Sequence, residues 1–330
     1  MKKLDIIIPQ YNENQLLVER LLNSIDSQIN IDKSLLGIII VNDCSNYALK
    51  DVIKVKYPNL DITLLKTPKN GGPGLARQFG IDYSTAEYIT FIDADDTYYS
   101  NDCLSKVMDV INKDKPNVIL TKFLEETRIN NKYSNILHTS DIIYIHGKFI
   151  NRMYLIENKI RFSQNLRLHE DSYFSSLLLF NTNSVYNLDV ITNFWRMNPN
   201  SIIRQKRKYH YLITSFKDFI NSNIELYNQL EIRHNEYKNE YVIKAITYLY
   251  CILASRLFEN KKDSYLMSLK NEYEQLFYNF LSDVMDVFSE ENPANVQTYM
   301  NEQIKIFENS TTKVIEPWFN FITRISSKYE

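Results

Sequence analysis

The sequence predicts an α/β protein with a mainly parallel sheet sandwiched by helices, followed by an all-α C-terminal appendage. Up to residue 124, short aliphatic runs alternate with stretches of helical spacing, which is the pattern of successive β-α-β units. Beyond residue 205 the apolar residues recur at helical spacing. All six glycines lie between Gly37 and Gly147, so the C-terminal region contains none.

The expected strands are short aliphatic runs, and the expected helices place apolar residues every three or four positions, as at Leu17, Leu21 and Ile25. Strands are predicted at Leu4–Ile8, Gly37–Val41, Asp61–Leu65, Tyr88–Ile92, Asn117–Leu124 and Ser184–Trp195. Helices are predicted at Asn14–Ile29, Tyr47–Val55, Pro73–Tyr83, Asn101–Asn112, Lys148–Glu157 and Asp171–Phe180. A chain of 330 residues is long enough for two domains, and we place them at 1–205 (α/β) and 206–330 (helical).

Composition and charge exclude several classes of protein. With 44% hydrophobic and 24% charged residues the chain resembles a soluble globular protein, and its net charge of −2 argues against one held mainly by phosphate backbones. Cys44, Cys103 and Cys251 are odd in number and lack metal-type spacing, so we expect a cytoplasmic protein without a disulfide framework. No apolar run suits a signal peptide or a membrane span, while peripheral attachment to a membrane stays open.

Three carboxylates follow the predicted strand Tyr88–Ile92, in the order Asp93-Ala94-Asp95-Asp96. Ligands bind at the carboxyl edge of an open parallel sheet. Like charges repel there unless a cation neutralises them, and Mg²⁺ or Mn²⁺ prefers oxygen ligands. The segment therefore predicts a metal site, with a solvated acidic loop that caps the next helix as the alternative.

Two further polar segments follow predicted strands. Pro9 ends the first strand, and the loop after it can place the Tyr11 ring against a planar base; a turn with Asn12 as a helix cap fits equally. After the second strand, Asp43 can accept hydrogen bonds from a nucleobase imide or a ribose hydroxyl, while Ser45 caps the next helix. We assign the ligand contact to Asp43, with capping alone as the competing interpretation.

A glycine-rich segment, Asn70-Gly71-Gly72-Pro73-Gly74, precedes a predicted helix. Glycines let the backbone approach a diphosphate, and a helix N-terminus favours anions. Arg77, one turn inside, can pair with the acidic cluster or with a phosphate. The segment lacks the Lys-Ser/Thr of a P-loop, so a kinase-like site is disfavoured.

Two more segments carry candidate residues. Glu170 and Asp171 open an apolar helix, which suits catalysis and suits complementation of the helix dipole equally. Arg196 and Ser201 lie in a polar turn after a predicted strand, where they could reach a leaving diphosphate or tie down the loop.

In their order and spacing, these motifs resemble the family 2 glycosyltransferases of the GT-A fold over residues 4–205. The resemblance rests on Pro9-x-Tyr11-Asn12-Glu13, Asp43 with Ser45, Asn70-x-Gly72 with Ala76-Arg77 and Gly80, Asp93-Ala94-Asp95-Asp96, Gly147-Lys148-Phe149, Glu170-Asp171 and the turn from Arg196 to Ser201. Asn42, Cys44 and Asn198 depart from a pattern that has Asp, Gly and, in some relatives, a His near the metal.

The resemblance implies an inverting transfer of a sugar from a nucleotide-diphosphate donor, UDP-glucose or a UDP-N-acetylhexosamine, to a hydroxyl of a glycan or cell-surface polymer. It makes Asp171 the general base, with Glu170 orienting it or binding acceptor hydroxyls. It makes Asp95, with Asp93 and Asp96, the ligands of Mn²⁺ or Mg²⁺. It assigns donor binding to Pro9, Tyr11, Glu13, Asp43, Asn70, Gly72, Arg77, Asp93, Ala94, Arg196 and Ser201.

Other functions stay open at this point. A nucleotidyltransferase would usually need a basic glycine-rich loop near the N-terminus, where this chain has Pro9-Gln10-Tyr11. A non-catalytic sugar-nucleotide-binding or scaffold protein is the third class. Protein and modified DNA bases are alternative acceptors, and the basic–aromatic run from Lys206 to Tyr211 keeps DNA open although the net charge disfavours it. Homo-oligomerisation through the helical tail is a further expectation.

Overall fold

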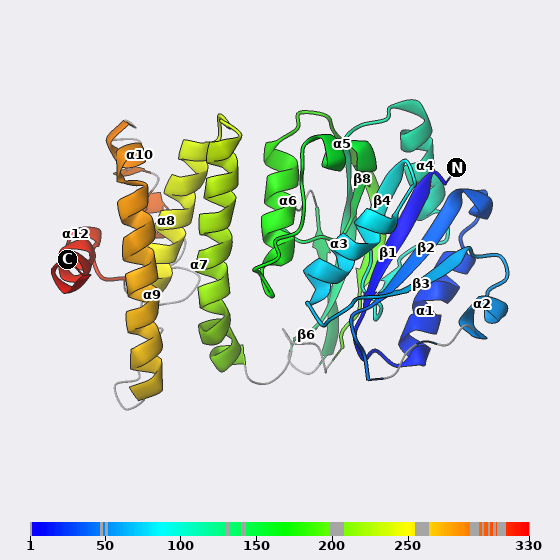
Figure 1. Ribbon diagram of the computed structural model, residues 1–330, viewed down its shortest axis with the longest axis horizontal. Helices are drawn as coiled ribbons and strands as arrows, with labels where there is room; N and C mark the ends of the chain where they lie inside the picture. The colour runs from blue at the N-terminus through cyan, green and yellow to red at the C-terminus, as the bar shows by residue number, and fades with distance from the viewer. Residues whose placement is uncertain are drawn as a thin grey trace. The chain divides into compact units, whose positions relative to one another are not determined.

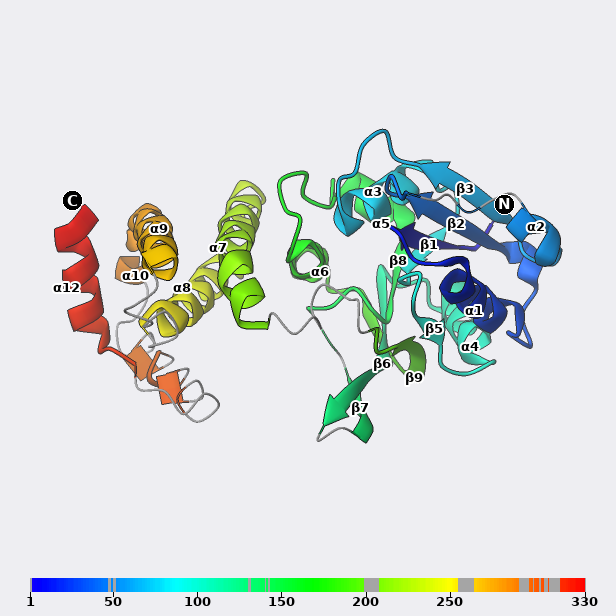
Figure 2. The same cartoon turned by 90° about the horizontal axis from the view of Figure 1, so that it is seen from below.

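The structure is a computed structural model that describes all residues except 1, 47–48, 50–51, 130–131, 140, 142, 199–207, 255–263, 291–296, 299, 303, 306–307, 309–314 and 330. The chain divides into two compact units, Met1–Gln205 and Lys206–Glu330. Figures 1 and 2 show the elements of each unit.

The first unit contains strands and helices in alternation. Its strands are β1 (Leu4–Gln10), β2 (Leu36–Asn42), β3 (Ile62–Lys66), β4 (Tyr88–Phe91), β5 (Thr97–Tyr98), β6 (Val118–Ile129), β7 (Lys132–His138), β8 (Lys148–Asn151) and β9 (Val185–Trp195). Its helices are α1 (Gln15–Asp26), the 3₁₀ turn η1 (Lys33–Leu35), α2 (Val52–Lys56), α3 (Pro73–Tyr83), α4 (Cys103–Lys113), α5 (Arg152–Glu157) and α6 (Glu170–Phe180).

These strands form one sheet in the order β3-β2-β1-β4-β8-β6-β9-β5, with β7 paired to β6. Strands β3, β2, β1 and β4 are parallel, as are β6 and β9, whereas β8 runs antiparallel between β4 and β6. In Figure 2, α1 and α4 lie on one face of the sheet and α3 and α5 on the other. The predicted fold class, a mainly parallel sheet between helices, is confirmed.

One predicted element was wrong in part. Lys148–Glu157 was expected to be a single helix, but its first four residues form β8 and only the rest forms α5. Phe149 and Ile150 are fully buried between β4 and β6, so pairing to two neighbouring strands outweighs helical spacing. Asn151 then starts the helix because its side chain accepts hydrogen bonds from the main-chain amides of Met153 and Tyr154.

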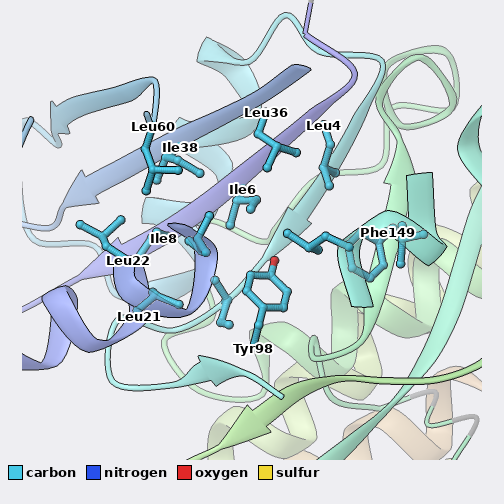
Figure 3. Close-up of a cluster of buried hydrophobic side chains, with 14 of the residues drawn as sticks. Leu4, Ile6, Ile8, Leu21, Leu22, Leu36, Ile38, Leu60, Tyr98 and Phe149 are labelled. Atoms are coloured by element: carbon cyan, nitrogen blue, oxygen red, sulfur yellow. The ribbon is translucent and has the colours of Figure 1, made fainter. Parts of the chain in front are cut away.

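The centre of the sheet is buried on both faces, which explains the uninterrupted aliphatic run of β1. Ile6 and Ile8 pack with Leu21 and Leu22 of α1 on one face (Figure 3). On the other face Ile7 lies against Gly80 of α3, where a Cβ would overlap Ile7 Cγ2. A residue without a side chain is therefore required at this helix–strand contact.

We expect Gly80→Ala to lower the free energy of unfolding by about 1–3 kcal/mol, because the added methyl group overpacks the contact with Ile7. Urea denaturation measures the loss. Adding Ile7→Ala should relieve the overlap, so the double variant should be less destabilised than the sum of the two single variants. Strictly additive losses would contradict this account of the contact.

The second unit contains α7 (Lys208–Ile232), α8 (Lys238–Ala254), α9 (Ser264–Asp283), α10 (Met285–Glu290) and α12 (Trp318–Tyr329). Its core includes Tyr250, Phe277 and Phe321, and it encloses the carboxylate of Glu274, which pairs with Arg324 at 2.9 Å. Lys206 and the other residues before α7 lie outside the described residues. None of the helices that the structure describes is both long and apolar enough to cross a membrane.

Candidate active site

A buried guanidinium joins two acidic segments that are 77 positions apart in the chain (170 − 93 = 77). Arg77 of α3 is only 3% exposed; its Nη2 lies 2.7 Å from Asp93 Oδ1, and its Nη1 lies 3.1 Å from Glu170 Oε1. Gly74 makes this approach possible, since a Cβ there would lie 2.6 Å from Glu170 Cγ. The loop after β4 and the start of α6 are therefore held together through α3.

The two acids paired with Arg77 have pKa values shifted in opposite directions. Burial acts to raise the pKa of Asp93, but the charges of Arg77 and His146 outweigh it and hold that pKa below its usual range. Burial, together with the neighbouring charge of Asp171, raises the pKa of Glu170 to about 7 in spite of Arg77. Asp93 is thus the firmly ionised partner of the pair.

Asp96 is completely buried and anchors two other segments. Its Oδ1 accepts the main-chain amide of Arg196 at 2.8 Å, and its Oδ2 lies 3.1 Å from His146 Nε2. The His146 ring stacks on Trp195, with the ring centroids 5.2 Å apart. Burial raises the pKa of Asp96 to about 7, because the hydrogen bond and charge of His146 offset only part of its desolvation.

Asp95 belongs to the same loop after β4 as Asp93 and Asp96. Its Oδ2 accepts a hydrogen bond of 2.7 Å from Asn198 Nδ2, and its main-chain carbonyl accepts one from Arg20. Burial and the nearby charge of Asp93 raise the pKa of Asp95. A cation beside these carboxylates would relieve both effects.

The donor atoms at this point suit a hard divalent cation. Asp93, Asp96 and His146 each offer a ligand atom, and these atoms lie within 4.8 Å of one another. Carboxylate oxygens are the ligands that Mg²⁺ prefers and that Mn²⁺ accepts. His146 Nε2 already faces Asp96, so we assign His146 to holding that carboxylate.

Asp43 lies beneath the glycine-rich segment. Its carboxylate is 2% exposed and accepts the amide of Gly71 at 3.0 Å, that of Gly72 at 2.8 Å and the hydroxyl of Thr67 at 2.9 Å. Asn70 donates to the Asp43 carbonyl at 2.9 Å. Gly72 has φ of +85°, a conformation that favours glycine. In this structure Asp43 fixes the glycine-rich loop, and its carboxylate oxygens are engaged by that loop and by Thr67.

The loop after β1 carries the other predicted donor residues. Tyr11 is 52% exposed, and its amide donates to Glu13 Oε2 at 2.6 Å. Burial raises the pKa of Glu13 to about 7, with smaller contributions from the charges of Asp95 and Asp93. Pro9 is a buried residue of β1. The exposed Tyr11 ring and the partly buried Glu13 carboxyl thus face different surroundings.

Two of the predicted donor-binding residues, Ala94 and Arg196, make contacts within the protein itself. Ala94 is 1% exposed and packs into the hydrophobic core. The Arg196 guanidinium lies 3.9 Å from the centroid of the Phe194 ring, and its Nε donates to Thr97 Oγ1 at 3.3 Å. Ser201 lies outside the described residues.

Adjacent acids at the start of α6 have different environments. Glu170 is 6% exposed and turned toward Arg77, whereas Asp171 is half-buried and accepts the amide of Ser172 at 2.8 Å. His169 precedes them with φ of +62°, which sets the entry of the chain into the helix. Asp171 is therefore the more accessible of the two acids.

Several residues around these acids were not singled out from the sequence. His146 and Arg20 contact the acidic loop, and Thr67 contacts Asp43. His146 directly precedes the Gly147-Lys148 motif, which was the one signal pointing to it. Arg20 and Thr67 lie in an ordinary helix and after an ordinary strand, so no local pattern marks them.

Residues 5–177 match the model of the family described as Glycosyl transferase family 2. This span is more than half of the chain, and the chain belongs to that family. The structure and this match therefore define a family 2 glycosyltransferase domain.

Relatives of known sequence match a similar part of the chain. It is 29% identical over 188 residues to a poly(ribitol-phosphate) beta-glucosyltransferase of Bacillus spizizenii, covering 52% of this chain and 29% of that protein. It is 28% identical over 192 residues to the minor teichoic acid biosynthesis protein GgaB of Bacillus subtilis, covering 53% and 21%. The chain thus spans less than a third of the length of these relatives.

Solved structures share the fold. S. aureus TarS 1–349 in complex with UDP aligns with a TM-score of 0.61 and 18% identity, over 86% of this chain and 80% of that one. The mannosyltransferase PcManGT of Pyrobaculum calidifontis, in complex with GDP-Man and Mn²⁺, aligns with a TM-score of 0.54 and 14% identity, over 99% and 86%. At these identities the likeness concerns the fold.

We expect Arg77→Met to cost about 3–5 kcal/mol in the free energy of unfolding, because it leaves the buried Glu170 and the one-third exposed Asp93 without their cation. Arg77→Lys should restore only part of this, since one ammonium cannot replace a fork that reaches two acids. Chemical denaturation near pH 8 measures both. Arg161→Met is the control: its pair with Asp82 is half-exposed, and its loss should stay below about 1 kcal/mol. Equal losses in the two Met variants would contradict the bridging role.

Proposed function

We propose that this chain is an inverting glycosyltransferase that moves a sugar from a UDP-sugar, UDP-glucose or a UDP-N-acetylhexosamine, to a hydroxyl of a glycan or cell-surface polymer. Residues 1–205 form the catalytic domain and residues 206–330 a helical domain. The observation that carries the proposal is the Arg77 bridge, which brings the acidic loop after β4 beside the acids of α6.

The family and its members support the choice of donor and acceptor. The chain belongs to Glycosyl transferase family 2, and structural relatives were solved with UDP and with UDP-GlcNAc. A sequence relative is a poly(ribitol-phosphate) beta-glucosyltransferase, and another takes part in minor teichoic acid biosynthesis. A hydroxyl of a surface polymer is therefore the acceptor class that we favour.

Donor binding uses residues from three loops. Tyr11, the exposed aromatic residue after β1, stacks on the base. Asp43 holds the amides of Gly71 and Gly72, so that the glycine-rich loop and the start of α3 receive the diphosphate. Arg196, directly after β9, assists in binding the diphosphate. Glu13, whose carboxylate accepts the Tyr11 amide, also takes part in donor binding.

Asp95, with Asp93 and Asp96, would hold Mn²⁺ or Mg²⁺ at the end of β4. When bound, such a cation offsets the negative charge that develops on the departing UDP. Asp96 contributes through its fixed position between His146 and the Arg196 amide.

Asp171 is the general base. It takes the proton of the acceptor hydroxyl as that oxygen bonds to the anomeric carbon of the donor sugar. The bond from that carbon to the diphosphate oxygen breaks on the opposite side, so the configuration inverts and UDP leaves. Glu170 orients the start of α6 through its ion pair with Arg77.

Asp171→Asn should lower the rate of sugar transfer by about 10²–10⁴-fold, because a neutral amide cannot accept the acceptor's proton. Binding of the UDP-sugar should stay close to normal. A UDP-release assay and calorimetry separate the two quantities. Asp189→Asn, which changes a largely exposed acid of β9, is the matched control and should retain full activity. Near-normal turnover in Asp171→Asn would refute the assignment of the base.

Asp95→Ala should weaken the binding of UDP in the presence of Mn²⁺ and leave the weaker metal-free binding unchanged, because it removes one ligand of the cation. Calorimetric titration of UDP with Mn²⁺ and with EDTA provides the comparison. Asp61→Ala removes a 59% exposed surface carboxylate and should have no effect. If the Mn²⁺ dependence survives in Asp95→Ala, the cation is held elsewhere.

A further inference from the structure

Aromatic rings form a column at the ends of β6 and β9, and none of the roles above uses it (Figure 2). The His138 ring stacks on Phe123 with the centroids 4.3 Å apart, and the Phe123 ring lies 5.2 Å from that of His146. The His146 ring in turn stacks on Trp195, also at 5.2 Å. Trp195, a partly exposed residue, is therefore backed by a row of stacked rings that fixes its orientation.

The Tyr144 ring lies beside that of Trp195. Their centroids are 5.4 Å apart and their planes are inclined by 57°. Both residues are partly exposed, and we call them the aromatic pair. Apolar ring surface in contact with water is covered favourably by a ligand that has an apolar face of its own.

The aromatic pair is joined by direct contacts to both acidic segments of the candidate active site. Trp195 stacks on His146, whose Nε2 lies 3.1 Å from Asp96 Oδ2 in the loop after β4. The carbonyl of Tyr144 accepts the hydroxyl of Ser175 at 3.4 Å, and Ser175 belongs to α6, the helix that begins with the two acids. A group bound on the pair would therefore lie beside both segments that the proposed reaction uses.

Negative charges surround the Tyr144 phenol. Burial raises the pKa of Tyr144, and the charges of Glu125, Asp141 and Asp171 raise it further. Lys148, whose ammonium donates to the carbonyls of Asp141 and Tyr144, is completely buried and so does not face a ligand. Carboxylates accept hydrogen bonds from hydroxyls and repel phosphates. These surroundings favour a neutral ligand with hydroxyl groups over a phosphorylated one.

We propose that the aromatic pair binds a pyranose ring of a neutral glycan acceptor, with the C–H face of the sugar packed on Trp195 and Tyr144. A pyranose has an apolar C–H face and a rim of hydroxyls, which match aromatic rings bordered by carboxylates. The proposal rests on the proposed function above and narrows its acceptor to a neutral sugar. An acyclic polyol phosphate lacks the flat apolar face and carries the charge that these acids repel.

Fluorescence gives a direct test, because the chain has two tryptophans and Trp318→Phe leaves Trp195 as the sole one. The full chain with this change, in UDP and Mn²⁺, is titrated with the methyl β-glycosides of glucose, galactose and N-acetylglucosamine, and separately with poly(ribitol phosphate). We expect a saturable change of the Trp195 emission with a methyl glycoside. If no glycoside changes the emission, or if poly(ribitol phosphate) binds more tightly than the glycosides, the proposal is overturned.

Tyr144→Leu in the same background removes one ring without altering the stack of Trp195 on His146, and it should weaken glycoside binding about tenfold. Tyr144→Phe keeps the ring and should bind nearly as the parent does. Tyr133→Leu is the matched control, since it removes a 70% exposed ring of β7. Equal binding in Tyr144→Leu and Tyr133→Leu would show that the sugar lies elsewhere.

Kinetics with UDP-N-acetylglucosamine as donor and the bound glycoside as acceptor separate the two substrates. Tyr144→Leu should raise the KM for the glycoside about tenfold and leave the KM for the donor unchanged. A rise in the donor KM alone would assign the rings to the donor side and overturn the proposal. Glycoside binding without any transfer of sugar would contradict the proposed function instead, because the fluorescence titration does not depend on turnover.

Discussion

A single guanidinium between two carboxylates is the constraint on which the rest of this molecule depends. Arg77 is buried, and its fork reaches an acid at the end of β4 and another at the start of α6. The buried Glu170 depends most on this cation, because desolvating an unpaired carboxylate is costly, whereas Asp93 is partly exposed. The pair in turn fixes how closely α3 and α6 approach, and Gly74 supplies the space.

The acids of the site divide into those that hold the structure and those that are available for chemistry. Asp43 and Glu170 are almost completely buried, and their oxygens are engaged by main-chain amides of the glycine-rich loop and by Arg77. Asp95 and Asp171 are less enclosed, with fewer fixed partners. Burial separates the two groups, since an enclosed carboxylate must satisfy all its hydrogen bonds within the protein. The carboxylates of this cluster repel one another, and Arg77 neutralises only part of their negative charge.

The alternation of strands and helices was largely predictable, because the central strands are buried on both faces and appear as uninterrupted aliphatic runs. Helix α3 has the predicted bounds, since Pro73 starts it. The first half of Lys148–Glu157 was misassigned, because a four-residue strand between two others has no periodicity of its own. The two-residue strand β5 was not predicted because its partner, β9, lies far along the chain. The strand β7 pairs with the neighbouring β6, but it is mostly exposed and has no run of buried aliphatic residues that would have marked it.

The sequence by itself determined the fold class, the family and the acidic and glycine-rich segments at the ends of the strands, because these follow from local spacing and residue type. Only the tertiary structure decided which of two adjacent acids turns to Arg77, that Asp43 lies under the glycine-rich loop, and that His146 holds Asp96. Those facts are hydrogen bonds and ion pairs between segments tens of residues apart. The packing of the sheet creates them, and no local pattern in the chain encodes them.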